Sequence, residues 1–395
     1  MLLLSVALAA RVLYIALAAP SAWGPNPLAY DGDGYLNHAA AFHSGDFLFS
    51  HADVRRMPLY PALIAFWTRL PAPEKWVLPI WHAALDTCAL ACAYLWVRRA
   101  FGEKSALAAA VLYAIYPMSI YRIPLMNTEV IASTALAMFV LGATRVWETG
   151  RCRDAAGLSL LTMVLLFINP AFMLFPPLLA FSFFFLLPLK PALRVGSAFL
   201  IPVVLISLAW GVRNYAVTGD FYLFDTRGGK EFWLGNNQRV EGRWEGPKRN
   251  VWEEELSELY RSMDREQASV SERNRRLYKK GVEEILENPS GATVLFIKKF
   301  FRFWYVPASE THLGVTIPAQ TGYLLLAVAG MFWGFPRNRR ILLPMGVVAY
   351  YCAIYSLSYA CIRFSQPIMP WVCALGGVGV AEGYHRLRRG KQNHE

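Results

Sequence analysis

Charged side chains are scarce in this chain of 395 residues, making up only 17% of it. Soluble domains carry roughly 25% charged residues, so the composition disfavours a soluble globular protein. Hydrophobic residues account for 55% of the chain. They fall in blocks of roughly 17 to 25 residues, the length that an α-helix needs to cross the hydrocarbon of a bilayer. The composition therefore predicts an all-α polytopic membrane protein with about ten transmembrane helices.

Cysteine is also sparse, with six residues that lie mostly inside apolar runs. Cys88 and Cys92 share a helix face, but the sequence places no further His or Cys at the spacing of a metal site. We interpret the cysteines as small packing residues, without a disulfide framework. No internal repeat of the kind that characterises inverted-repeat transporters is visible in the sequence.

The apolar runs define the expected spans. The first run lacks the basic start and small-residue cleavage site of a signal peptide and carries Arg11 in its middle, so we expect a retained span. The first five predicted spans cover about residues 1–20, 76–97, 105–121, 130–146 and 155–168. A sixth span follows and ends at 187, and a seventh lies between Arg194 and 211. The last three spans cover about 318–335, 341–359 and 366–384.

Basic residues lie in the short segments between alternate spans, which accounts for much of the formal net charge of +11. The positive-inside rule assigns the side that carries them to the cytoplasm. We therefore predict an integral membrane protein with both termini cytoplasmic and with the loops 21–75 and 212–317 facing outward. Membrane lipids are expected partners, and nucleic acid is not, because topology already explains the basic residues.

Three domains follow from this topology. Residues 1–211 form an N-terminal membrane domain whose first outward loop, 21–75, is catalytic. Residues 212–317 form an extracytoplasmic loop domain with an interfacial helix, because its last part is basic and rich in aromatic residues. Residues 318–395 form C-terminal membrane helices and a basic cytoplasmic tail.

The loop domain 212–317 is expected to be small and mainly helical. Its segment 220–237 alternates bulky and small residues, which predicts a short hairpin or an extended loop. Residues 250–264 and 271–287 are predicted helices, with Ser271 as N-cap and a stop at Asn288 and the proline after it.

Two carboxylates, Asp31 and Asp33, stand in an Asp-Gly-Asp-Gly sequence directly before a short helical stretch in the first outward loop. One interpretation is purely structural, because Asp and Gly form turns and Asp caps helices. Soluble glycosyltransferases use Asp-x-Asp to bind a metal and a nucleotide sugar, but nucleotide sugars are not supplied on the outward face. The spacing excludes an EF-hand, and His38 and His43 are too few for a zinc site.

Charged side chains gather near this same predicted surface. Each has a simple alternative role, because an arginine can snorkel to the headgroups and Glu129 can cap its helix. Taken together, anion-binding groups around carboxylates at the level of lipid phosphates favour chemistry on a phosphate-linked group of a lipid. The set comprises Asp31, Asp33, Arg55, Arg56, Glu129, Arg213, Lys298, Lys299, Arg302 and Arg363.

An ordered set of motifs supports this hypothesis. The chain resembles the polytopic glycosyltransferases of the C-type fold, specifically the dolichyl-phosphate-mannose-protein mannosyltransferase-like group and its bacterial relatives that add aminoarabinose to lipid A. The resemblance rests on Asp31 followed by Tyr35 and an Ala-rich helix, Gly45-Asp46-Phe47, the Arg-x-Pro-Leu-Tyr-Pro of 56–61, Glu129, RNYAVTGDF at 213–221, GG and FWLGNN within 228–237, and RFSQPIMP at 363–370.

The resemblance implies an inverting glycosyltransferase of a bacterial inner (plasma) membrane. It would move a sugar from a polyprenyl-phosphate donor to a protein, lipid or glycan acceptor, with its active site on the extracytoplasmic face. It implies that Asp31 is the catalytic base and that Arg56 holds the donor phosphate. The family often has Asp-Glu where this chain has Asp-Gly-Asp, so Asp33 is the alternative base, or a metal or acceptor ligand. A divalent metal is the one cofactor left open, and no metal-binding residues are assigned.

Further residues complete the expected site. Arg55, Arg213 and Arg363 join Arg56 as donor phosphate ligands, and the expected substrate-binding residues are Tyr35, Tyr60, Glu129, Asn236 and Asn237. Two alternatives stay open: a non-enzymatic lipid or glycolipid transporter or flippase, and a glycan ligase that uses a pyrophosphate-linked lipid. A transporter should place ionisable residues near the bilayer midplane, where Arg11 and Asp86 are the main candidates.

Overall fold

The chain folds into helices throughout the part that the computed structural model describes, which comprises residues 2–22, 32–47, 56–71, 74–243, 249–306 and 313–392. These residues form 17 α-helices and three short 3₁₀ helices. They are α1 Leu2–Ala22, α2 Gly32–Ser44, α3 Leu59–Trp67, α4 Glu74–Phe101, α5 Glu103–Ala114, α6 Pro117–Arg122, α7 Glu129–Thr149, α8 Cys152–Ile168, η1 Pro170–Phe172, α9 Phe175–Leu186, α10 Leu189–Thr218, α11 Gly228–Asn236, α12 Arg249–Arg265, α13 Val270–Glu287, α14 Pro289–Tyr305, α15 Leu313–Gly334, η2 Arg339–Ile341, α16 Leu342–Leu357, η3 Ile362–Ile368 and α17 Met369–Gln392.

Several helices are suited to a membrane. Within the described residues, five are long and apolar enough to cross a bilayer: Trp76–Phe101, Glu129–Thr149, Leu189–Thr218, Arg339–Leu357 and Ile362–Arg389. Leu2–Leu17 and Pro170–Phe185 are shorter apolar helices. Long apolar runs flanked by polar loops are typical of a polytopic helical membrane protein, and this coarse prediction is confirmed.

The predicted span 105–121 is wrong as a continuous helix. α5 ends at Ala114 and α6 begins at Pro117, because proline cannot donate the backbone hydrogen bond that would continue the helix and its ring restricts the residue before it. The break after 168 is where the sequence predicts it. There the Asn169 side chain accepts a hydrogen bond from the amide of Ala171 at 2.9 Å and caps η1.

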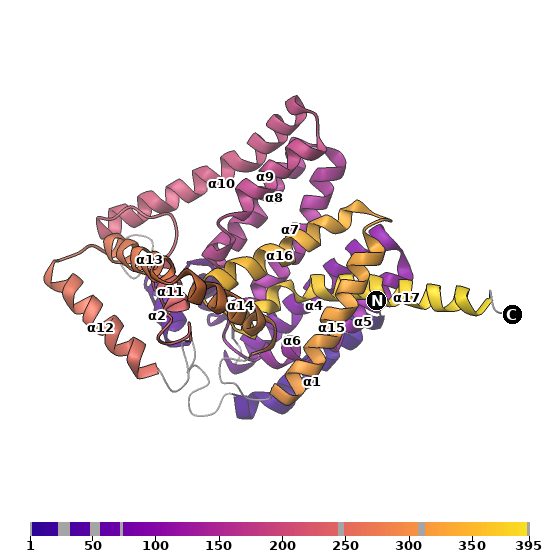
Figure 1. The fold of residues 1–395 in the computed structure, drawn as a ribbon, viewed down its shortest axis with the longest axis horizontal. Helices are drawn as coiled ribbons and strands as arrows, with labels where there is room; N and C mark the ends of the chain where they lie inside the picture. The colour runs from indigo at the N-terminus through magenta and orange to yellow at the C-terminus, as the bar shows by residue number, and fades with distance from the viewer. Residues whose placement is uncertain are drawn as a thin grey trace.

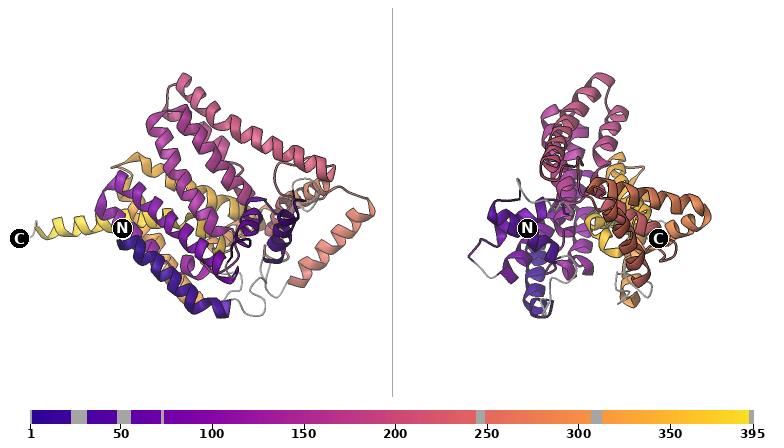
Figure 2. Two further views of the ribbon diagram at one scale, coloured as in Figure 1. Left: turned by 180° about the vertical axis from the view of Figure 1, so that it is seen from behind. Right: turned by 90° about the vertical axis from the view of Figure 1, so that its left-hand side faces the viewer.

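Helices α11, α12 and α13 belong to residues 212–317, which are called the outward domain below as a name for this segment. α11, α12 and α13 gather at one end, and the last turns of α17 project from the opposite end (Figure 1, and Figure 2 from behind). α17 packs closely on α15 and α5, since a Cβ on Gly330 would lie 1.8 Å from the carbonyl oxygen of Leu375 and one on Gly377 would lie 2.4 Å from the amide nitrogen of Ala109. Small residues allow membrane helices this approach.

The outward helices have a small core of their own, formed by residues of α11, α12 and α13 and the turns beside them: Trp233, Leu234, Val240, Trp252, Leu256, Met263, Ala268 and Leu277. The helices predicted at 250–264 and 271–287 are confirmed as α12 and α13, and α13 ends at Glu287 as predicted. Its N-cap is Ser269, which accepts from the amide of Glu272 at 3.3 Å, rather than the predicted Ser271.

The predicted hairpin or extended loop over 220–237 is wrong for residues 228–236, which form the helix α11, whereas residues 220–227 form a loop without a helix. The two glycines at its start permit close contact with α13. The amide of Gly229 donates to the Asn274 side chain at 2.7 Å, and a Cβ on this glycine would lie 2.2 Å from the carbonyl oxygen of Asn274. The bulky and small residues therefore alternate for helix packing and not for strand pairing.

Two charged side chains inside the bundle, Arg11 and Asp86, form an ion pair with each other. Arg11 and Asp86 are fully buried and lie 2.6 Å apart. The hydroxyl of Tyr113 donates to the second Asp86 oxygen at 2.6 Å, and Arg11 also donates to the carbonyl of Ala7 at 3.1 Å and to the hydroxyl of Ser119 at 3.3 Å. Because both charges have partners on neighbouring helices, this pair ties α1 to α4 and α5.

Candidate functional site

The centre of the candidate site is the Arg56 side chain, which lies against the first turn of α2. Its guanidinium donates to the hydroxyl of Tyr35 at 3.2 Å, and its Cζ lies 4.4 Å from the centroid of the Tyr35 ring. A Cβ on Gly34 would be 3.3 Å from Arg56 Nε. Since the N-terminal end of a helix carries free amides and positive potential, the guanidinium and this helix end both favour an anion.

The Tyr35 ring, which contacts the guanidinium, packs in turn on a second tyrosine. Tyr35 meets Tyr60 edge to face, with ring centroids 4.8 Å apart at 88°. Both tyrosines are buried. The Tyr60 hydroxyl lies 3.5 Å from Nε2 of His82, and Nδ1 of His82 is 2.9 Å from the carbonyl of Ile123. A carbonyl only accepts, so the proton is assigned to Nδ1, which leaves Nε2 to accept from Tyr60.

A second charged group stands next to these rings, at the start of α7. Glu129 is 4% exposed and accepts a hydrogen bond from Nε of Arg363, with which it forms an ion pair. Tyr60 lies within the electrostatic reach of both residues, and so does Arg122 at the end of α6. Oε2 of Glu129 has no hydrogen-bond partner among the described residues. A buried carboxylate oxygen without a partner is costly, so this position is suited to a hydroxyl donor of a ligand or to water.

A carboxylate from the outward domain also approaches Arg56. Asp225 lies between α10 and α11, and its charge interacts with Arg56 and Arg227. Burial raises the pKa of Asp225 to about 6, although the two guanidinium groups oppose this shift. The outward domain thereby adds a carboxyl group that titrates near neutral pH to the surroundings of Arg56.

Arg213 lies at the other end of α2. Its guanidinium donates to the carbonyl of Phe47, and it also packs on two rings, with its Cζ 5.3 Å from the centroid of Phe47 and 5.1 Å from that of Trp210. The neighbouring Asn214 is fully buried and donates to the carbonyl of Tyr222 at 2.9 Å. The RNYAVTGDF motif therefore joins the first outward loop to α10 and to the start of the outward domain.

The two asparagines of the FWLGNN motif are buried in the outward domain. Asn236 donates to the carbonyls of Phe232 at 2.8 Å and Leu357 at 2.9 Å, and accepts from Lys299 Nζ at 3.0 Å. Asn237 donates to Glu255 at 3.0 Å. These bonds connect α11 with α14, with the end of α16 and with α12.

The basic residues of α14 face in different directions. Lys299 is 1% exposed, and burial and the nearby Arg302 lower its pKa to about 7. Arg302 donates to the carbonyl of Glu241 at 2.5 Å. The expectation that both cations face the lipid phosphates is wrong, because they point into the protein, while Lys298 is half exposed.

The structure brings together one part of the predicted site. Arg56, Tyr35, Tyr60, Glu129 and Arg363 form a continuous group, which we call the Arg56 cluster. Asp31 and Arg55 lie outside the described residues, as does the side chain of Asp33, whose backbone belongs to α2. Arg213, Asn236 and Asn237 make the contacts described above with other parts of the chain, and their substrate roles stay predictions.

Three residues of this region were not predicted: His82, Arg122 and Asp225. A histidine inside a membrane span indicates a functional residue. His82 lies within the predicted span 76–97, so this residue could have been predicted from the sequence. Asp225 has no such signal, because its approach to Arg56 depends on how the outward domain packs on the bundle.

The fold defines a polytopic helical membrane protein, and the Arg56 cluster is a group of charged and aromatic side chains contributed by several of its helices. Residues 51–210 match the family model described as PMT_2, dolichyl-phosphate-mannose-protein mannosyltransferase. Over this segment the chain is similar to that family of lipid-phosphate-sugar-dependent glycosyltransferases, so the predicted resemblance and the enzyme class are confirmed. The matched segment contains Arg56, Tyr60 and Glu129. A comparison with curated proteins finds no match.

Proposed function

We propose that the chain transfers a sugar, with inversion, from a polyprenyl-phosphate donor to an acceptor on the extracytoplasmic face of a bacterial inner membrane. The observation that carries this proposal is the position of Arg56 against Gly34 and Tyr35 in the first turn of α2, next in sequence to the two carboxylates of the Asp-Gly-Asp-Gly motif. A phosphate held by Arg56 would lie beside Gly34, the residue that follows Asp33 in the chain.

The proposed roles follow from this arrangement. Asp31, or Asp33 in its place, takes the proton from the acceptor as the anomeric bond breaks. Arg56 binds the donor phosphate and stabilises the charge that develops on it as it leaves, because a guanidinium matches two phosphate oxygens at once. The leaving phosphate needs little proton donation.

The remaining cluster residues position these groups or bind substrate. Tyr35 and Tyr60 are buried, so we assign them to holding the Arg56 guanidinium rather than to contact with the sugar. Glu129 retains one carboxylate oxygen for a sugar or acceptor hydroxyl. Arg363 neutralises Glu129 and limits the cost of burying it.

The helix α14 supports the proposed membrane placement of the site. Its outward side exposes Val294, Ile297, Phe300 and Phe301, while Leu295, Lys299 and Phe303 are buried against the protein. A helix with an exposed apolar side next to an anion site is suited to lie in the lipid interface, at the depth where a polyprenyl phosphate presents its headgroup.

The transporter alternative is less well supported, since Arg11 and Asp86, the charges expected to serve it, form a buried ion pair with each other. The test of the proposed function uses a deletion strain complemented with the wild-type chain, Asp31→Asn or Asp33→Asn. Mass spectrometry of surface glycans, lipids and proteins identifies the product, and immunoblotting measures the protein in membranes. Glu258→Gln, which removes an exposed charge on α12, is the control.

We expect Asp31→Asn to abolish the product at normal protein levels and the control to retain it. Full activity in both aspartate variants would reject the assignment of the base. Transfer of a whole glycan with loss of a pyrophosphate lipid would instead establish the ligase alternative.

A further inference from the structure

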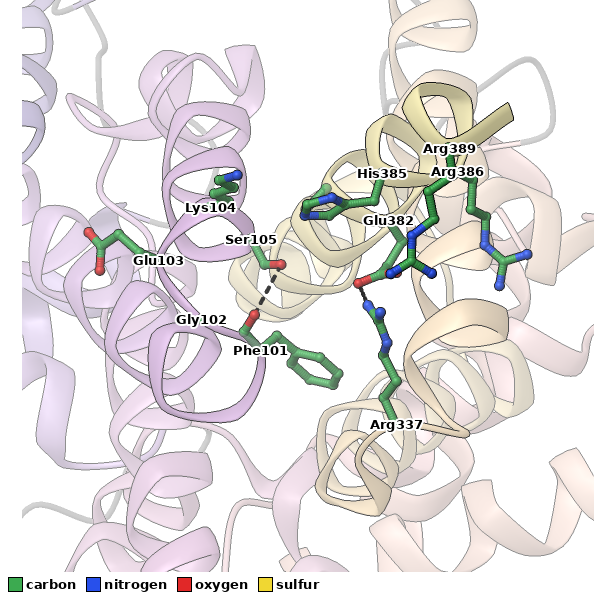
Figure 3. A pocket seen from close by; sticks show the side chains of 11 residues that line it. Phe101, Gly102, Glu103, Lys104, Ser105, Arg337, Glu382, His385, Arg386 and Arg389 are labelled. Carbon is green, nitrogen blue, oxygen red and sulfur yellow. Dashed lines mark hydrogen bonds and ion pairs between the residues drawn. The ribbon is translucent and has the colours of Figure 1, made fainter. Parts of the chain in front are cut away.

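A second charged site lies at the opposite end of the bundle, in a cavity of about 660 Å³. Three segments line it: the turn from α4 to α5, the turn after α15, and the last turns of α17. Its charged residues are Glu103, Lys104, Arg337, Glu382, Arg386 and Arg389, with His385 beside them. Figure 3 shows these side chains around the cavity.

The cavity lies about one bilayer thickness from the Arg56 cluster. Tyr60 of the cluster contacts His82 in α4, whereas the cavity begins at Phe101, the last residue of the same helix. At 1.5 Å per residue these positions are roughly 28 Å apart, close to the thickness of the hydrocarbon core. The cavity is therefore at the headgroup level of the other leaflet.

The positive charge of the cavity exceeds its negative charge. Glu382 is buried and forms an ion pair with Arg337. Glu103 points away from the side chains of α17 (Figure 3) and accepts a hydrogen bond from the Tyr94 hydroxyl at 2.5 Å. The remaining basic side chains of the cavity are those of Lys104, Arg386 and Arg389. No carboxylate among the residues that line the cavity forms an ion pair with them.

The walls of the cavity are held firmly. The Asn338 side chain donates to the carbonyl of Ala100 at 3.0 Å and ties the turn after α15 to the end of α4. The Arg386 guanidinium packs on Trp333, with its Cζ 5.3 Å from the ring centroid. The backbone amides of the first turn of α5 also lie at the cavity. They have no side-chain cap, because the N-cap residue is Gly102. The arrangement is preorganised for an anion.

The surroundings favour an anion attached to a lipid. Large apolar side chains are exposed along the outside of the same helices: Phe332 and Phe335 on and after α15, and Val380, Tyr384 and Leu387 on α17. Acyl chains can cover such surfaces, while basic pockets between membrane helices bind phosphate headgroups.

We propose that this cavity binds the phosphate of an anionic phospholipid in the leaflet opposite the Arg56 cluster. The interaction consists of charge-assisted hydrogen bonds from Lys104, Arg386 and Arg389 to phosphate oxygens. This site is separate from the donor phosphate site, and it does not depend on the proposed reaction.

The test compares the purified full-length chain with Lys104→Gln/Arg389→Gln in delipidated detergent solution. Native mass spectrometry measures binding of phosphatidylglycerol, phosphatidylcholine and inorganic phosphate. Arg151→Gln/Arg388→Gln is the matched control, because it removes two exposed basic residues from the same end of the molecule that do not line the cavity. The thermal midpoint of each variant verifies that it is folded.

We expect phosphatidylglycerol to bind the wild type at least tenfold more tightly than phosphatidylcholine. The cavity variant should lose roughly tenfold in affinity for phosphatidylglycerol, and the control should not. Equal loss in both double variants, or equal binding of both lipids by the wild type, would overturn the proposal. Binding of inorganic phosphate in preference to phosphatidylglycerol would overturn the assignment to a lipid.

Discussion

Replacement of Arg56 by lysine tests the centre of the proposed mechanism. Lysine keeps the positive charge but lacks the planar fork that binds two phosphate oxygens and stacks on an aromatic ring. Arg56 uses this geometry already, since it lies 4.4 Å from the Tyr35 ring centroid and donates to the Tyr35 hydroxyl at 3.2 Å. Lysine would therefore lose both the orientation and one phosphate contact.

The expected magnitude follows from these contacts. A cation–π contact in a desolvated site contributes about 0.5–2 kcal/mol to the placement of the cation. Loss of one preorganised donor to developing negative charge costs roughly 100- to 1,000-fold in kcat. We therefore expect Arg56→Lys to reduce sugar transfer roughly 100-fold and Arg56→Gln to reduce it further, because glutamine also removes the charge.

The assay measures initial rates of product formation in membrane vesicles from the complemented deletion strain, quantified by mass spectrometry and normalised to protein level. Arg69→Lys is the control, since Arg69 follows α3 in the same loop and is exposed. A wild-type rate in Arg56→Lys would refute the phosphate role. A lower thermal midpoint that accounts for the whole loss would indicate a structural role instead.

Three further predictions concern stability, measured as thermal midpoints in detergent. Arg363→Gln should destabilise the protein by roughly 3–5 kcal/mol, because it leaves Glu129 buried without its cation; the double variant Arg363→Gln/Glu129→Gln should recover part of this loss, and no recovery would argue against the pair. The pKa of Asp225 is raised from 3.8 to about 6 in the folded protein. Between these two pH values the native state therefore binds more protons than the unfolded state, so the contribution of Asp225 to the free energy of unfolding falls as the pH rises from 3.8 to 6. Asp225→Asn should then stabilise the protein at pH 8 by at most about 3 kcal/mol, with no difference below pH 4; an equal gain at both pH values would contradict the shift. Gly229→Ala should disrupt the contact of α11 with α13, where a Cβ would lie 2.2 Å from a backbone oxygen, whereas Gly322→Ala, with nothing within 4 Å of its Cβ, should be neutral or slightly stabilising.

Local sequence signals were reliable where one element decides the outcome. The ends of α8 and α13 follow from Asn-Pro steps, which break a helix whatever surrounds them. Signals that depend on partners were less reliable. The pair of glycines at 228–229 suits a turn or a helix contact equally well, and only the presence of Asn274 beside Gly229 decides for the helix.

In the candidate site, too, the sequence predicted positions along the chain but not the contacts between distant side chains. The sequence placed Arg56, Glu129 and Arg363 near one surface, because all three lie at the ends of apolar runs. It did not show that Glu129 pairs with Arg363, that Arg56 rests on Tyr35, or that Lys299 and Arg302 turn inward, because each of these depends on side chains distant in the chain.

By itself, the sequence determined that this is a helical membrane protein and indicated its family, because hydropathy, short motifs and their order are properties of the chain alone. Only the tertiary structure decided which side chains each charge contacts. Arg11 and Asp86, the most conspicuous charges in an apolar run, form an ion pair with each other, while Arg56 contacts Tyr35 at the start of α2. The physical reason is that a buried charge is stable only beside a partner, and helix packing selects that partner.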